Sequence, residues 1–112
     1  MHNHFTTLWD SLEFIAKLKQ CSCSRLAVRG GLNSTTFNRS KRTSNYNQEH
    51  WISVNSLIKV LNGANMSMLE FGVIYHIIYK TRTSPKQEHV QKAISDINTL
   101  MQQHIDGITQ AS

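Results

Sequence analysis

The sequence predicts an all-α fold, with five helices in residues 1–80 and one additional helix in residues 81–112. Apolar residues recur at steps of three and four along most of the chain, which is the period of an amphipathic helix. Residue types that favour helix N-termini also stand before each periodic segment. These expected caps are Thr7, Ser22, Asn33, Ser53, Ser67 and Ser84.

The first helix is expected to begin at Thr7 and to end near Gln20. Asp10 follows Thr7 by three residues, which is the spacing of a capping box. Lys17 in the last turn suits the negative end of the helix dipole, and contact with phosphate is the alternative role. One apolar face is expected, made by Phe5, Leu8, Leu12 and Ile15.

The segment Ser22–Arg42 predicts two short helices joined by a tight turn. A small residue at a close helix crossing, a glycine four residues later and an apolar residue six beyond it form the helix-turn-helix pattern. Ala27, Gly31 and Phe37 have this spacing. Asn33 is expected to cap the second helix. The alternative is an ordinary helical hairpin with a polar outer face.

Charge favours a nucleic-acid role for this segment. The chain has a net charge of +5, yet there is no Asp or Glu from residue 14 to residue 48. Solvated helix faces usually mix the two signs, whereas a block of one sign is expected where a protein contacts phosphates. Seven of the twelve basic residues lie in this block: Lys17, Lys19, Arg25, Arg29, Arg39, Lys41 and Arg42.

Two kinds of DNA contact are predicted. Hydroxyl, amide and guanidinium groups on the outer face of the second helix suit base edges in the major groove. The predicted base contacts are Ser34, Thr35, Asn38 and Arg39. The predicted phosphate contacts are Lys17, Arg25, Lys41 and Arg42.

Three stretches carry a family resemblance: LWDSLEFIAKL, SRLAVRGGLNSTTFNRSKR and WISVNSLIKVLNGANMSMLEF. They resemble the N-terminal DNA-binding domain of lambda-repressor-like (Cro and C1 class) regulators, especially those with a LexA-like S24 peptidase domain. The similarity covers residues 5–71 and implies a five-helix head that inserts a recognition helix into double-stranded DNA. Gly30 departs from the family, which usually has Ala or a larger apolar residue there. The peptidase strands and cleavage site are absent, so self-cleavage is not expected.

Two more helices are expected in the head after a polar segment that follows Arg42. Trp51 in that segment is interpreted as a hydrophobic plug that folds back on the core. Ser67 and Glu70 form a capping box. The residues expected to face inward are Leu57, Ile58, Leu61, Met66, Met68, Leu69, Val73, Ile74, Ile77 and Ile78.

The last helix is expected to begin after Ser84-Pro85 and to run to about Asp106. Its apolar residues follow alternating steps of four and three, the spacing of a coiled-coil seam. They are Val90, Ile94, Ile97, Met101 and Ile108. These residues predict a homodimer, and the alternative is that the helix packs on its own head against Val73 and Ile77.

Other functional classes find little support. The acids are scattered and the six histidines form no metal or catalytic motif, so neither an enzyme, a metal site nor a cofactor is predicted. Cys21 and Cys23 lack a second pair for zinc. Neither a signal peptide, a membrane span nor a small-molecule ligand is expected, and the predicted location is the cytoplasm. Besides a DNA-binding regulator, a small protein-interaction module such as an antitoxin remains open, as does a decayed relative of a longer repressor.

Overall fold

The computed structural model describes residues 3–43, 48–83 and 85–111, except for the side chains of Arg39 and of residues 109–111. Within these ranges the fold is all-α, as predicted. An isolated antiparallel bridge between Thr43 and Glu49 is the only β pairing there. The helices are α1 (His4–Leu18), α2 (Cys23–Arg29), the 3-10 helix η1 (Arg39–Lys41), α3 (Val54–Gly63), α4 (Met68–Thr81) and α5 (Gln87–Ala111).

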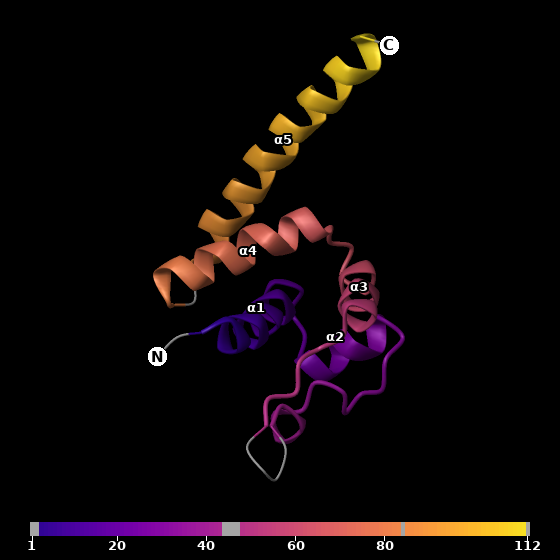
Figure 1. Cartoon of the computed structure of the whole chain (residues 1–112), viewed down its shortest axis with the longest axis vertical. Helices are drawn as coiled ribbons and strands as arrows, with labels where there is room; N and C mark the ends of the chain where they lie inside the picture. The colour runs from indigo at the N-terminus through magenta and orange to yellow at the C-terminus, as the bar shows by residue number, and fades with distance from the viewer. Residues whose placement is uncertain (1–2, 44–47, 84, 112) are drawn as a thin grey trace.

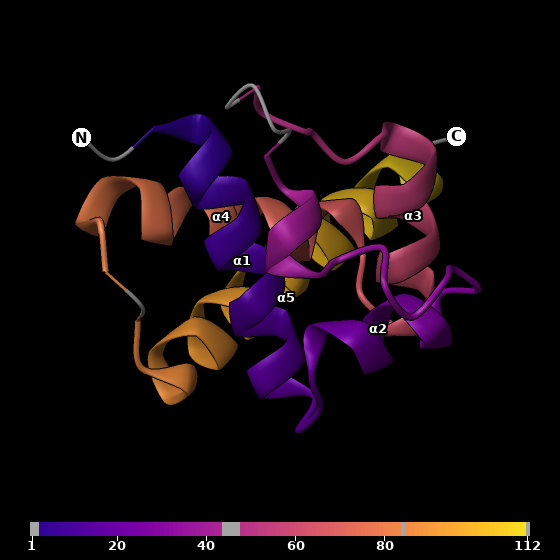
Figure 2. The same ribbon diagram turned by 90° about the horizontal axis from the view of Figure 1, so that it is seen from below.

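Helix α1 lies at the centre of the head, between α4 on one side and α2 with the following loop on the other (Figures 1 and 2). Of its predicted apolar face, Leu8, Leu12 and Ile15 are buried and Phe5 is partly buried. The helix begins at His4 because the Asn3 side chain accepts a hydrogen bond from the Thr6 amide at 2.9 Å. The expected cap at Thr7 is therefore wrong, and this residue is buried inside the helix.

Two glycines allow α2 and α3 to cross in backbone contact. A Cβ atom built on Gly30 would lie 2.8 Å from the Lys59 carbonyl oxygen, and one on Gly63 would lie 2.6 Å from the Arg29 carbonyl oxygen. Neither position therefore has room for a side chain. This crossing explains why Gly30 departs from the family pattern.

The predicted second helix of the helix-turn-helix is not an α-helix. Between residues 33 and 41 three amides, those of Thr36, Asn38 and Lys41, each donate to the carbonyl three residues earlier. Only η1 within this stretch is regular. Consecutive Ser and Thr residues favour such turns because their hydroxyl groups compete for backbone partners. Phe37 is nevertheless buried, as predicted.

The expected caps of α3 and α4 are confirmed. The Ser53 hydroxyl accepts from the Ser56 amide at 3.1 Å, and Ser67 forms the full capping box with Glu70. Most of the inward faces are also confirmed. Three residues expected in the core are instead exposed, because α3 and α4 turn them away from α1: Ile58, Met68 and Leu69.

Helix α5 packs on α4 only near its start and then projects from the head (Figure 1). Val90 is fully buried and Ile94 is nearly so, whereas Met101 and Ile108 are exposed and Ile97 is intermediate. The prediction that all five form one intermolecular seam is therefore wrong for the first two, which close the core of their own head. The expected cap at Ser84 lies outside the described residues.

Candidate nucleic-acid interface

The basic segment lies at the end of the molecule opposite the tip of α5 (Figure 1). Residues 30–43, which include η1, form this end; α2 lies next to them, and the last turn of α1 leads into the start of α2 (Figure 1). Because α5 points away, the two regions predicted to bind different partners are separated along the 55 Å long axis. We call the basic end, defined by residues 17–43, the basic surface.

The centre of the basic surface is a turn organised by Asn33. Its side-chain oxygen accepts from the amide and the hydroxyl of Thr35, at 3.0 and 2.9 Å. This is an Asx-type turn, which replaces the expected N-cap. Lys41 donates to the Thr35 hydroxyl at 3.0 Å, and this hydrogen bond links the turn to η1. Ser34 and Thr35 are exposed, which leaves them accessible as candidate base contacts.

Asn38 lies deeper than the sequence suggests. It is half-buried, and its side-chain oxygen accepts from the Ser24 hydroxyl at 3.4 Å. It lines a cavity of about 360 Å³ together with Lys17 and with residues at the start of α2. The structure therefore brings one predicted base contact and two predicted phosphate contacts, Lys17 and Arg42, to the same hollow. The side chain of Arg39, the fourth predicted base contact, lies outside the described residues.

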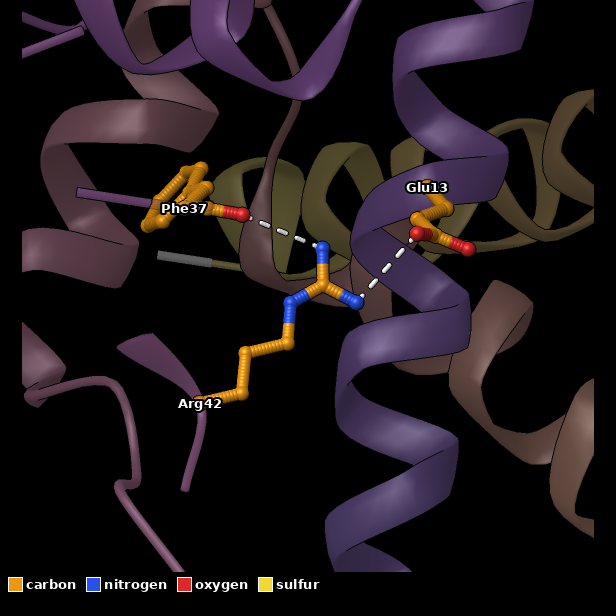
Figure 3. Close-up of polar contacts among 3 residues, drawn as sticks. All are labelled: Glu13, Phe37 and Arg42. Atoms are coloured by element: carbon orange, nitrogen blue, oxygen red, sulfur yellow. Dashed lines mark hydrogen bonds and ion pairs between the residues drawn. The ribbon is translucent and has the colours of Figure 1, made fainter. Parts of the chain in front are cut away.

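The Arg42 guanidinium points to the Glu13 carboxylate and to the Phe37 carbonyl (Figure 3). One nitrogen pairs with the Glu13 carboxylate at 3.2 Å, and another donates to the Phe37 carbonyl at 3.2 Å. The guanidinium also stacks over Trp9, 4.5 Å from the ring centroid. Only 14% of the side chain is exposed. Arg42 thus fastens the loop to α1, and the phosphate role predicted for it does not fit this geometry.

The other three predicted phosphate contacts have exposed side chains: Lys17, Arg25 and Lys41. Arg29 on α2 is also exposed, and its Nη1 lies 3.8 Å from the Cys21 sulfur. This arginine belongs to the basic block of the sequence but is not among the predicted contacts. Its accessibility at the end of α2 makes it a further candidate.

A second hollow lies beside η1. It has a volume of about 280 Å³, and Lys41, His50 and Trp51 contribute to its lining. Backbone contacts fix His50, because its amide donates to the Arg42 carbonyl at 2.8 Å and its Nδ1 lies 3.1 Å from the Lys41 carbonyl. Trp51 packs edge-on against Phe5 but leaves 54% of its surface exposed. Trp51 was predicted to be a buried hydrophobic plug, and in the structure only about half of its surface is buried.

Cys21 and Cys23 are half-buried free thiols on the wall of the larger hollow. Burial raises the pKa of the Cys23 thiol, and the Glu13 carboxylate raises it further, while Arg42 acts in the opposite direction. Cys23 is therefore protonated at neutral pH and is a weak nucleophile. Among the described residues no three His, Cys, Asp or Glu side chains are arranged to hold a metal ion. None of the described helices combines the length and apolarity that a membrane span needs.

Comparison with protein-family models, curated proteins and solved structures finds no match for this chain.

Proposed function

We propose that this protein is a sequence-specific DNA-binding regulator of transcription that contacts double-stranded DNA through the basic surface. The observation that carries the proposal is the excess of basic residues in residues 14–48, a stretch that contains seven Lys or Arg and no acid and that lies between Glu13, which is paired with Arg42, and Glu49. Three exposed cations from separate elements, Lys17, Arg25 and Lys41, lie there in a stretch without a single Asp or Glu. Phosphate contacts of this kind supply most of the affinity of DNA-binding proteins.

The proposed reading of bases differs from that of a preformed recognition helix. The exposed hydroxyls of Ser34 and Thr35 stand on the Asx turn, and Asn38 lies behind them with Arg39 on η1. Such groups match the donors and acceptors of base edges. The resemblance of the sequence to lambda-repressor-like regulators supports DNA as the partner, but turns replace the recognition helix that it implies. A regulator of this kind works in the cytoplasm.

Fluorescence anisotropy with random and selected duplexes tests the proposal. Replacing Lys17, Arg25 or Lys41 by Ala should weaken binding to every sequence and lower the slope of log affinity against log salt by about one unit. Lys92→Ala is the matched control, because this exposed lysine lies on α5, away from the basic surface. Salt-independent binding, or an equal effect of the control, would contradict the assignment.

A selection from random duplexes tests the sequence-reading part. Arg39→Ala should cost about 1–3 kcal/mol on the selected sequence and little on random DNA. Equal losses of binding free energy on the selected and the random duplexes would show that Arg39 contacts only phosphate and that the protein binds DNA without sequence specificity.

One observation favours the alternative of a small partner-binding protein. Large apolar side chains are exposed on α4 and α5, and such patches usually mark contacts with proteins. They lie away from the basic surface, so the two activities are compatible. A chain that binds no duplex at low salt, yet associates through α5, would make protein binding the main function.

A further inference from the structure

The second half of α5 carries an apolar stripe that its own head leaves uncovered. α5 has 25 residues and is roughly 37 Å long. Steps of three and four place Ile94, Met101 and Ile108 on one face. Ile94 is covered by the head and the later two are not. The residues Leu100, Met101, Ile105 and Ile108 are exposed, and we call them the α5 stripe.

A groove of matching chemistry lies between α4 and α5 of the same chain. It has a volume of about 470 Å³ and a lining without Asp, Glu, Lys or Arg. Two large side chains at its rim, Met68 and Leu69, are exposed. Its walls are formed by Met68, Leu69, Gly72, Val73, His76 and Ile77 of α4 and by Ala93 and Ile97 of α5, which we call the α4–α5 groove.

The dimensions of stripe and groove agree. The α4 wall extends from Met68 to Ile77, about 14 Å along a helix axis, and the stripe from Leu100 to Ile108 covers about 12 Å. The α5 stripe of one copy is therefore long enough to fill most of the groove of another. It cannot enter the groove of its own chain, because α5 is a continuous helix that runs away from α4 at this point (Figure 1).

We propose that two copies of this chain form a symmetric dimer in which the α5 stripe of each lies in the α4–α5 groove of the other. A twofold axis buries both stripes and both grooves, so the contact closes on itself. The arrangement unites α4 and α5 of both copies in one four-helix layer. It differs from a coiled coil of two α5 helices, in which stripe would meet stripe.

The exposed apolar area supports a second copy of this chain as the occupant of the α4–α5 groove. The stripe together with Met68 and Leu69 comprises six side chains that each expose between 41% and 64% of their surface. They present on the order of 600 Å² per copy, so reciprocal burial approaches the 1,200 Å² at which stable interfaces begin. The neighbouring groove walls add to this area.

Charge also favours a second copy over a membrane or a nucleic acid. From residue 87 to residue 111 the sequence has one Lys and no Arg, and this Lys92 stands among the acids Glu88, Asp96 and Asp106. Helices that bind anionic membrane surfaces carry several Lys or Arg on the polar face. The basic surfaces of the two copies stay remote from this contact, so they do not repel each other across it.

Sedimentation equilibrium without DNA tests the proposal with three variants. Met101→Glu/Ile105→Glu changes the stripe, Leu69→Lys changes the groove, and Gln103→Glu on the polar side of α5 is the charge control. The stripe and groove variants should each weaken the dimer by at least about 100-fold, because each buries an ion against apolar groups. The control should dimerise like the unchanged chain. Circular dichroism should show that the three variants are folded like the unchanged chain, since the substituted side chains are exposed.

Mixing the stripe and groove variants separates this contact from a coiled coil. Each mixed pair contains one unaltered stripe in an unaltered groove and one carboxylate pair facing a lysine, so the mixture should dimerise where neither variant does alone. Loss of dimer in the stripe variant alone, with none in Leu69→Lys, would overturn the groove contact in favour of α5 pairing. An unchanged chain that sediments as a monomer at high concentration, or that binds anionic vesicles through α5, would overturn the dimer. Because no DNA is present, these results do not depend on the proposed DNA binding.

Discussion

Replacing Arg42 by Ala tests whether this residue is structural or contacts DNA. The substitution removes the Glu13 ion pair, the hydrogen bond to the Phe37 carbonyl and the stacking on Trp9. It also frees the loop that follows η1 from α1. The sequence alone placed Arg42 among the phosphate contacts, so the expected effect on stability is a direct test of the geometry in Figure 3.

The expected loss of stability is at least about 3 kcal/mol. Removing one partner of a buried ion pair typically costs about 3–5 kcal/mol. The lower end applies here because 29% of the Glu13 side chain is exposed and its carboxylate regains some water. The lost cation–π contact adds about 0.5–1 kcal/mol, and the Phe37 carbonyl loses a charged donor. A domain of this size should then melt at least about 12 °C lower.

Urea denaturation followed by circular dichroism measures this loss, with Lys41→Ala as the matched control. Lys41 is exposed one residue away, so its removal should change stability by no more than about 0.5 kcal/mol. Arg42→Lys should recover only part of the loss, because an ammonium cannot bridge a carboxylate and a carbonyl as a planar guanidinium does. An Arg42→Ala protein as stable as the control, but weakened in DNA binding, would refute the structural role.

Two further predictions concern the core. Gly63→Ala should destabilise the fold by at least about 1–3 kcal/mol in urea denaturation, because the new methyl group meets the Arg29 backbone at 2.6 Å; Gly72→Ala, with open space around it, should be neutral or stabilising by up to about 1 kcal/mol. In a Cys21→Ser protein, alkylation of Cys23 should require a higher pH in the folded state than in urea, because burial raises its folded pKa. The folded state then binds the Cys23 thiol proton more tightly than the unfolded state does. The stabilisation from the protonated thiol is therefore fully present below the unfolded pKa, and it is lost as pH rises through the folded pKa. Equal alkylation profiles, or a Gly63→Ala protein as stable as the Gly72→Ala protein, would count against the packing described.

Local chemistry explains which helix starts were predictable. Ser22, Ser53 and Ser67 each accept from the amide three residues later, and this contact needs nothing beyond the same turn. Asn33 makes an equally local contact, but to the amide two residues later, which produces a turn in place of a helix. The sequence pattern does not distinguish these two outcomes. A helix begins where the side chain accepts from the amide three residues later, and a turn forms where it accepts from the amide two residues later.

Contacts between distant residues explain what the sequence did not predict. Arg42 was assigned to phosphate because its charge fits, but its partner Glu13 is 29 residues away and no local signal pairs them. Likewise, Gly30 departs from the family pattern because the backbone of α3 packs against it and leaves no room for a side chain. Trp51 was expected to be buried, yet Phe5 covers only one edge of it. In each case the partner comes from another element of the fold.

The spacing along α5 identified an apolar face but not the surface that covers it. The spacing places Val90, Ile94, Ile97, Met101 and Ile108 on one apolar face, and the structure divides that face between the head and solvent. Val90 and Ile94 are buried in the core of the head, and Ile97 lines the α4–α5 groove. An amphipathic helix that extends beyond its own domain leaves about three turns without a partner. The uncovered turns lie at the opposite end from the basic surface, so association through α5 leaves the proposed DNA contacts free in both copies.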